Sequence, residues 1–210
     1  VRDLKANEII YLADKRQELH FTQLFRCAKQ TNIAKNTELY FVGFGTMNGK
    51  DGKPFKTRAG GVMRLADLIK IIKDAGFEKL KENENIKGEE AQLVASKVGL
   101  AALKYGDLSN QASKNYIFDI DRFASFEGNT GPYILYTIAR IKSILRKADN
   151  NINGTIIEPQ SDDERNLMLY LVKFNEAVET SFRDHAPHKV CDYIYELSNA
   201  FNHFYHETKI

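Results

Sequence analysis

Residues 8–44, EIIYLADKRQELHFTQLFRCAKQTNIAKNTELYFVGF, decide the fold of the first part of this chain. The apolar run 8–13 predicts a short buried strand that ends at Asp14, and 38–44 predicts a second strand. Between them, apolar side chains recur with the spacing of one helix face, at Phe21, Leu24, Phe25 and Ala28. A strand, a helix and a strand within about 36 residues predict a βαβ unit with a parallel sheet and a right-handed crossover.

The segments after the two strands are the expected place for a ligand, because parallel sheets bind ligands at the carboxyl ends of their strands. The loop 45–61, GTMNGKDGKPFKTRAGG, carries five glycines, one proline and four cations and has no apolar periodicity. Loops of this length are uncommon inside a compact domain and tend to be functional or disordered. Cations on a glycine-rich loop can neutralise an anion such as a departing pyrophosphate. A solvated surface loop is the alternative.

From Leu65 onward the pattern predicts helices and no strand. An apolar stripe predicts a helix that Gly76 ends, 78–90 is a polar connector, and a further helix covers roughly 91–104. Later helices begin with a capping box at Ser161 and with a proline at Pro187. Three of these helices carry an apolar stripe that predicts the face buried in the core. The stripes are Leu65, Leu68, Ile69 and Ile72; Leu167, Leu171, Phe174 and Val178; and Val190, Ile194, Leu197, Phe201 and Phe204.

The predicted fold class is therefore α/β followed by all-α. A partial Rossmann-type parallel sheet occupies residues 1–62, and a helical bundle occupies residues 63–210.

One further helix, PYILYTIARIKSILRK, has Pro132 at its first position. Ile134, Ile138, Ile141 and Leu145 fall on one narrow stripe, which predicts the core face. A second line lies roughly 130° around the helix, and its members are Tyr133, Tyr136 and Arg140. Tyrosine rings and a guanidinium outside the core can stack on unpaired bases and meet phosphate. Packing of the tyrosines against a neighbouring helix is the alternative.

Composition argues against several other classes of protein. The net charge of +2 is too balanced to indicate nucleic-acid binding by itself. No apolar run approaches the ~20 residues of a membrane span, and the first ten residues lack the shape of a signal peptide. Cys27 and Cys191 lie far apart, which fits a reducing cytoplasm and gives no disulfide or zinc framework. Two histidine pairs, in 185–188 and 203–206, have no further ligands at a fixed spacing, so we expect no metal site.

Four stretches carry a family signature: IIYLADKRQELHFTQLF, VGFGTMNGKDGKPFKTRAGG, KYGDLSNQASKNYIFDIDRFASFEGNTGPYILYTIARI and YIYELSNAFNHFYHE. In this order they resemble arginyl-tRNA synthetase, a class I aminoacyl-tRNA synthetase, over nearly the whole chain. The third stretch is the most diagnostic, because GNTGPY followed by Y-x-x-x-R is typical of the arginine enzyme rather than of its class I relatives.

The resemblance implies roles for individual residues. Gln17, the glutamine of R-Q-x-L-H, would contact the amino-acid substrate, and His20 would lie near the arginine or the adenylate. Tyr133, Tyr136 and Tyr205 match aromatic residues that the family uses around the anticodon loop. Tyr205 lies about 60° from the buried stripe of its helix, so a packing role competes there.

The loop has an implied role as well. F-K-T-R-A-G occupies the position of the class I KMSKS loop, so Lys56, Thr57 and Arg58, with Lys53, would close over ATP. Lys56 and Arg58 would be the catalytic cations. The segment departs from the K-M-S-K-S spelling, which leaves the separate lysine roles open.

The implied reaction has two steps. The carboxylate of arginine attacks the α-phosphate of ATP and displaces pyrophosphate, which gives arginyl-adenylate. The terminal ribose hydroxyl of tRNA then takes the arginyl group from the adenylate and releases AMP. The resemblance thus implies tRNA, arginine and ATP as partners, with Mg²⁺ on ATP, and a monomer in the cytoplasm.

The family's H-x-G-H motif is absent, and the family continues past Ile210 through further helix. We therefore expect this chain to be part of a longer ligase and to be inactive by itself. The alternatives are a free-standing helical tRNA-binding module without catalysis and another class I synthetase with a similar helical domain.

Overall fold

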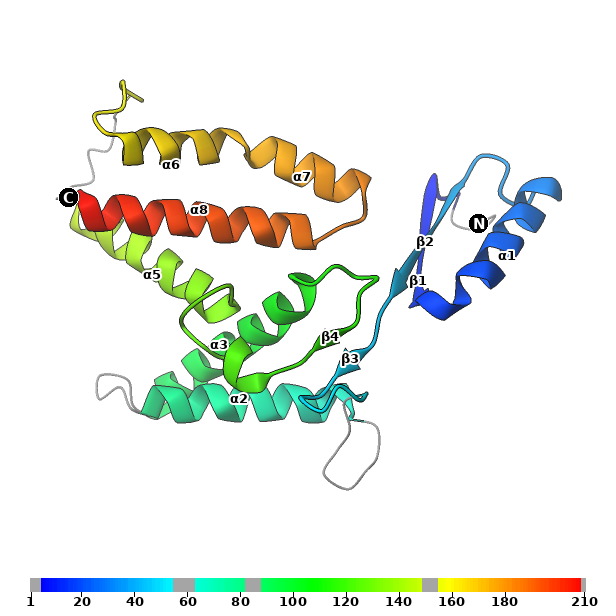
Figure 1. Ribbon diagram of the computed structural model, residues 1–210, viewed down its shortest axis with the longest axis horizontal. Helices are drawn as coiled ribbons and strands as arrows, with labels where there is room; N and C mark the ends of the chain where they lie inside the picture. Colours follow the sequence, from blue (N-terminus) through cyan, green and yellow to red (C-terminus); the bar gives the residue numbers. More distant parts are fainter. Residues whose placement is uncertain (1–4, 55–62, 82–87, 149–154, 209–210) are drawn as a thin grey trace. The chain divides into compact units, whose positions relative to one another are not determined.

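The structure is a computed structural model, and it describes residues 5–54, 63–81, 88–148 and 155–208 (Figure 1). The chain divides into two compact units. The first unit consists of Val1–Phe55 and Asn110–Phe118, and the second consists of Lys56–Ser109 and Asp119–Ile210. A parallel βαβ unit precedes a run of helices, which one two-residue strand interrupts, and this order confirms the fold class.

The first unit contains the predicted βαβ unit. Strand β1 (Glu8–Asp14) is followed by a 3-10 turn η1 (Lys15–Gln17), helix α1 (Glu18–Gln30) and strand β2 (Glu38–Phe44). The two strands pair in parallel along their whole length. Both strands and the crossover helix are therefore confirmed, but the burial predicted for β1 is wrong, because each of its residues is exposed or half-buried.

Helix α1 covers one face of this sheet. Tyr11 and Phe41 are opposite each other in the register, and their rings contact those of Phe21 and Phe25, with ring centroids 5.0 to 5.3 Å apart. Leu24 was expected in the same stripe and is 43% exposed. On the other face of the sheet, side chains that alternate with the covered ones are open, as Leu12 at 68% exposure shows.

A second small sheet corrects the prediction that no strand follows Leu65. Strand β3 (Met47–Asn48) lies inside the predicted loop and pairs in parallel with β4 (Tyr116–Ile117). Each strand has only two residues, and the partners are far apart in the sequence. Neither has the alternating run from which a strand is recognised, which is why the sequence pattern missed them.

The second unit is helical. Its elements are α2 (Leu65–Lys81), α3 (Gly88–Leu108), α4 (Ile120–Phe123), α5 (Gly131–Lys147), α6 (Asp162–Val172), α7 (Phe174–Arg183) and α8 (His188–Glu207). Helix α2 packs on α3, α3 packs on α5, and α8 contacts α5 on one side and α6 and α7 on another (Figure 1). No helix in the described part of the chain is long and apolar enough to cross a membrane.

The contact between α2 and α3 is close because small residues line it. Leu68 and Ile72 of α2 are buried, with 3% and 0% exposure, whereas Leu65 of the same predicted stripe is exposed. A β-carbon on Gly99 of α3 would lie 2.9 Å from the Cα of Lys73. The prediction that Gly76 ends this helix is wrong, because α2 continues to Lys81 and Gly76 faces α3 instead.

Ser161 caps a helix as predicted, although the Glu164 carboxylate accepts from the Gln160 N–H rather than from that of Ser161, and the apolar face expected after it is divided. The Ser161 hydroxyl accepts a hydrogen bond from the Glu164 N–H at 3.1 Å. The helix then ends at Val172, and α7 begins at Phe174, so Leu167, Leu171, Phe174 and Val178 do not form one buried stripe. The last three are 40 to 57% exposed. No glycine or proline marks the break between α6 and α7, so the sequence carries no local signal for it.

The predicted core face of α5 is also partly wrong. Ile138 and Leu145 are 42% and 51% exposed, and Thr137, which lies between the two predicted lines, is only 2% exposed. Helix α5 is covered by α3 and by α8, so its buried positions are set by two neighbours rather than by one apolar stripe. On α8 the buried residues are Cys191, Ser198 and Ala200. The predicted stripe is only partly confirmed, because its five positions are half-buried: Val190, Ile194, Leu197, Phe201 and Phe204.

Candidate functional site

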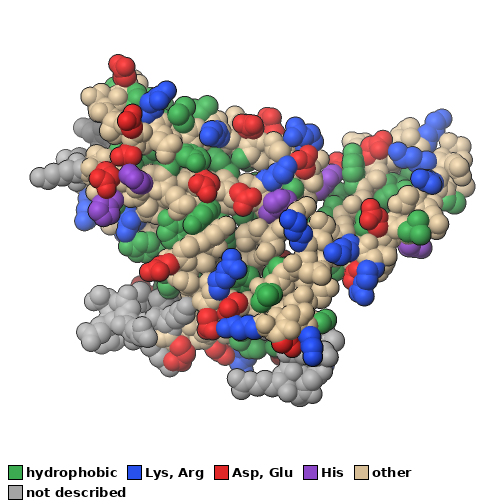
Figure 2. Space-filling view, viewed as in Figure 1, with side chains coloured by type: hydrophobic (Ala, Val, Ile, Leu, Met, Phe, Trp, Pro, Cys, Tyr) green, Lys and Arg blue, Asp and Glu red, His purple; other side chains and the backbone are tan. Residues whose placement is uncertain are grey.

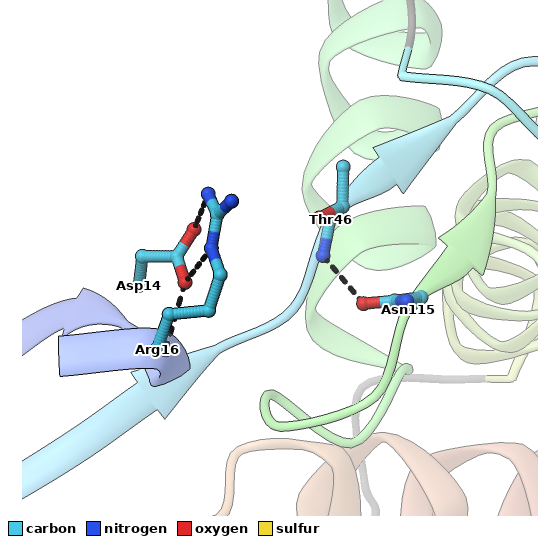
Figure 3. A network of polar contacts seen from close by, with 4 residues as sticks. All are labelled: Asp14, Arg16, Thr46 and Asn115. Atoms are coloured by element: carbon cyan, nitrogen blue, oxygen red, sulfur yellow. Dashed lines mark hydrogen bonds and ion pairs between the residues drawn. The ribbon is translucent and has the colours of Figure 1, made fainter. Parts of the chain in front are cut away.

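The carboxyl end of β1 holds an ion pair between two charged side chains, Asp14 and Arg16. The Nε and Nη2 atoms of Arg16 bind the two carboxylate oxygens of Asp14 at 2.8 and 2.6 Å (Figure 3). The side-chain hydrogen bond from Arg16 and the bond from its backbone N–H hold the pKa of Asp14 at about 2. Asp14 also begins the 3-10 turn, so this pair fixes how the chain leaves the strand.

Two predicted substrate-binding residues follow directly. Gln17 is the last residue of η1 and His20 is in the first turn of α1, and both are exposed. The turn between strand and helix therefore brings both to the carboxyl end of the parallel sheet, where such sheets bind ligands.

A segment that sequence reasoning did not assign to this region also lies here. Residues 110–118 belong to the first unit, where Lys15 donates its Nζ hydrogen bond to the Ser113 carbonyl at 3.1 Å. The backbone N–H of Thr46 donates to Oδ1 of Asn115 at 2.9 Å (Figure 3). A β-carbon on Gly45 would lie 2.3 Å from the Lys114 carbonyl oxygen, so only glycine fits directly after β2.

Most of the residues predicted to act in the loop lie outside the described part of the chain. Lys56, Thr57 and Arg58 lie outside the described residues. Lys53 is exposed, and its backbone N–H donates to the Asp51 carboxylate at 3.1 Å.

The second candidate site lies between α5 and α8. The guanidinium carbon of Arg140 is 4.7 Å from the ring centroid of Tyr136 and 5.0 Å from that of Tyr205. These distances are in the range of cation–π contacts. Tyr136 is 48% exposed and Tyr205 37% exposed, so both rings and the cation between them reach the surface. Three of the four predicted tRNA-binding residues thus form one cluster.

The fourth, Tyr133, lies deeper between the same helices. Its hydroxyl donates to Oδ1 of Asn199 at 2.8 Å and accepts from Nδ2 of Asn202 at 2.9 Å. The ring is half-buried and makes an edge contact with Tyr195 at a centroid distance of 5.9 Å. In this chain the packing alternative therefore describes the position of Tyr133, whereas Tyr136 remains open.

An open cavity of about 570 Å³ adjoins the exposed cluster. Its volume lies within the ~300–1,000 Å³ typical of small-ligand sites. The residues that line it come from α5, its carboxyl end and α8, and they are Tyr136, Ala139, Arg140, Ser143, Ile144, Lys147, Ala148 and Tyr205. Two tyrosine rings, apolar side chains and two cations line this cavity, and such a lining can hold a planar anionic ligand such as a nucleotide.

Charged side chains of both signs lie on the surface of the chain. On the face drawn in Figure 2, lysines and arginines alternate with acidic side chains over the helices. Among the described residues no group of three or more histidine, cysteine or acidic side chains could hold a metal ion.

Sequence reasoning missed the residues that support the two sites. Ser113 and Asn115 lie within the diagnostic third stretch, and Asn199 and Asn202 lie within the fourth. Asn202 precedes Tyr205 by three positions, which places both on one side of a helix, and this spacing was the available signal.

Comparison with known proteins places both candidate sites in one family. Residues 1–120 match the family described as tRNA synthetases class I (R), catalytic domain. Residues 134–210 match the DALR anticodon binding domain.

Two curated relatives match over the whole chain. Arginine–tRNA ligase from Alkaliphilus oremlandii is 65% identical and that from Agathobacter rectalis is 57% identical. The chain spans 36% and 37% of the length of these relatives.

Solved structures agree. The chain is similar to arginyl-tRNA synthetase from Plasmodium falciparum, with a TM-score of 0.81 and 30% identity over 97% of this chain and 35% of that one. The Thermus thermophilus arginyl-tRNA synthetase gives a TM-score of 0.77 at 25% identity, over 98% of this chain and 34% of that one. Because the family match, the curated relatives and the fold agree, we conclude that the chain belongs to the arginyl-tRNA synthetase family of class I.

Proposed function

We propose that this chain works as part of an arginine–tRNA ligase, which activates arginine with ATP and transfers it to tRNA. Residues 1–62, joined by the returning segment 110–118, serve the catalytic step. Residues 63–210 otherwise serve tRNA binding. By itself the chain is inactive, because no H-x-G-H motif is present to complete the nucleotide site.

One observation carries the tRNA part of the proposal. Tyr136, Arg140 and Tyr205 form an exposed cluster beside a cavity, within the region that matches an anticodon binding domain. Stacking rings with a guanidinium between them are suited to an unpaired base and its phosphate, because every base offers a flat face and every phosphate a negative charge.

The catalytic part is supported by the edge of the first sheet. Gln17 and His20 are exposed after β1, and we propose that they contact arginine and the adenylate. Lys53, Lys56, Thr57 and Arg58 close over ATP in this proposal, and Mg²⁺ arrives bound to the phosphates of ATP. The whole synthetase would act as a monomer in the cytoplasm.

The test compares the whole synthetase that carries this chain with the 210-residue chain alone. We expect the synthetase to attach labelled arginine to arginine-accepting tRNA and not to cysteine-accepting tRNA. The chain alone should show no arginine-dependent exchange of pyrophosphate into ATP. Charging of the cysteine tRNA, or exchange by the chain alone, would contradict the proposal.

A free-standing tRNA-binding module is the second candidate, and the self-contained packing of α2 to α8 favours it. This candidate predicts that cells make the chain as a separate protein of 24.0 kDa that binds arginine tRNA. The ligase predicts that the chain occurs only within a longer protein. Immunoblotting of the source cells with an antibody to this chain separates the two.

A further inference from the structure

We propose that Asn202 of α8 is a positioning residue that holds the Arg140 guanidinium in place for tRNA. The inference rests on the proposed function of the α5–α8 site. Oδ1 of Asn202 accepts a hydrogen bond from Nη1 of Arg140 at 2.8 Å, and this bond is partly buried. Asn202 does not line the cavity, so it would act through Arg140 rather than on the RNA.

The hydrogen bonds around Asn202 allow only one orientation of its amide. Nδ2 donates to the hydroxyl oxygens of Tyr133 and Thr137, at 2.9 and 3.0 Å. With the nitrogen engaged on that side, the oxygen faces Arg140. The reversed amide would present N–H groups to a guanidinium, which has donors only. The fixed orientation therefore favours the bond to Arg140.

The hydroxyls on the other side are themselves fixed. Tyr133 donates to Oδ1 of Asn199 at 2.8 Å, and Thr137 donates to the Tyr133 carbonyl at 3.1 Å. Each hydroxyl thus accepts from Asn202 and donates elsewhere, so each hydrogen has a defined place. Thr137 is 2% exposed, which keeps water from replacing its bond. A network in which every group is satisfied is rigid.

Rigidity in this network matters for Arg140. Its Nη1 is held by Asn202 and its Nη2 by the Tyr136 hydroxyl at 2.6 Å. A guanidinium has five N–H donors in one plane, so fixing two of them orients the remaining donors. A side chain that is ordered before RNA arrives loses less conformational freedom on binding, and binding is tighter for that reason.

A double-mutant cycle in the whole synthetase tests this coupling. The variants are Asn202→Leu, Arg140→Met and the double variant, and the readouts are KM for arginine-accepting tRNA and kcat of aminoacylation. We expect Asn202→Leu to raise KM about tenfold, as for a lost hydrogen bond to a charged group, with kcat nearly unchanged. In the Arg140→Met background, Asn202→Leu should add nothing further.

Asn199→Leu is the matched control. Asn199 lies at the other end of the same network and accepts from Tyr133, but no bond joins it to Arg140 among the described contacts. We expect it to lower the melting temperature as Asn202→Leu does. KM should change less than about threefold, because Asn202 still accepts from Arg140 and still donates to Thr137. Should Asn202→Leu fail to fold, Asn202→Ser, which is smaller and polar, takes its place in the same cycle.

The outcomes separate the two proposals. Suppose that Arg140→Met raises KM but Asn202→Leu leaves KM unchanged, or raises it by the same factor with and without Arg140→Met. Asn202 then does not position Arg140, while the proposed tRNA site remains supported. A rise in KM for Asn199→Leu equal to that for Asn202→Leu would also overturn the positioning role. If Arg140→Met and Tyr136→Ala both leave KM unchanged, the proposed tRNA site fails, and the role of Asn202 fails with it.

Discussion

A β-carbon added to Gly131 would lie 2.2 Å from the carbonyl oxygen of Ala101. Gly131 is the buried first residue of α5, so this helix begins in direct contact with the backbone of α3. Thr130 caps the helix by accepting a bond from the Tyr133 N–H at 3.2 Å. The G-N-T-G-P-Y sequence therefore fixes both where α5 begins and how closely it approaches α3.

Replacing Gly131 with alanine should destabilise the chain. The methyl group has no room, so the two helices must separate, and overpacking of this kind costs about 1–3 kcal/mol. Urea unfolding followed by helical circular dichroism measures the change. Ala139→Ser, on an exposed position of the same helix, is the control and should cost roughly 0.5 kcal/mol. Equal stability of Gly131→Ala and the unchanged chain would show that the helices are not in close contact.

Removing the ring of Tyr136 should weaken tRNA binding and leave the fold intact. Loss of one stacking surface typically costs ~1–3 kcal/mol of binding, and a side chain that is 48% exposed supports little packing. Binding of an anticodon stem-loop to Tyr136→Ala and its melting temperature are the measurements. Tyr136→Phe keeps the ring and loses only the bond to Arg140, so its effect should be smaller. A large fall in melting temperature with unchanged binding would show that the ring serves packing.

The loop cations should act on the chemical step. In whole synthetase, Lys56→Ala or Arg58→Ala should lower kcat about 10²–10³-fold, because each removes a charge from the departing pyrophosphate. Lys35→Ala, an exposed lysine outside this loop, is the control and should have little effect. Single-turnover formation of the adenylate distinguishes a slower chemical step from weaker ATP binding. If the KM for ATP changed while kcat stayed the same, neither residue would have the proposed catalytic role.

Alkylation should distinguish the two cysteines. Cys27 is exposed, whereas Cys191 is buried, and burial raises the pKa of the Cys191 thiol to about 11. At pH 8 only about 10⁻³ of Cys191 would be thiolate, the reactive form. Iodoacetamide should therefore label the folded chain once and the urea-unfolded chain twice, as mass spectrometry would show. In Cys27→Ser the folded chain should take no label, and rapid labelling there would mean that α8 opens readily.

Asp14 should titrate well below an ordinary aspartate. Its pKa is held at about 2, against about 3.9 in an unfolded chain, mainly by the hydrogen bond from the Arg16 side chain. Because the folded value is the lower one, the stabilisation is complete above pH 4 and disappears as the pH falls from about 4 to about 2. The carboxyl carbon shift in NMR gives the titration midpoint. In Arg16→Gln it should move up toward the ordinary value, and an unchanged midpoint would assign the shift to another cause.

The parts of the fold that the sequence predicts are those with a local periodic signal. In the βαβ unit each strand is a continuous apolar run and the helix repeats at i, i+3, i+4, so both strands and α1 follow from residues near one another. The β3–β4 pair has no such signal, because two residues at 47–48 meet two at 116–117. Its formation depends on the packing of 110–118 against the end of β2, which only the folded chain supplies.

The candidate site shows the same limit. The helical arithmetic identified Tyr136 and Arg140, because both lie on one side of α5. It could not rank Tyr133 below them, since that depends on Asn199 and Asn202 of α8, more than sixty residues away. The exposure of Ile138 has the same origin. A helix with two neighbours buries whichever positions face them, and a single apolar stripe cannot report which positions those are.

The return of residues 110–118 to the first unit has a practical consequence for anyone who divides this chain. Either unit is discontinuous in sequence, so scission at a single peptide bond cannot yield two intact pieces. A helical piece that starts at residue 63 would retain β4 but lack β3, its hydrogen-bonding partner in the small sheet. The backbone groups of Tyr116 and Ile117 would then form a short, unpaired strand edge. Excising 110–118 and bridging Ser109 to Asp119 with a brief flexible joint would avoid that edge.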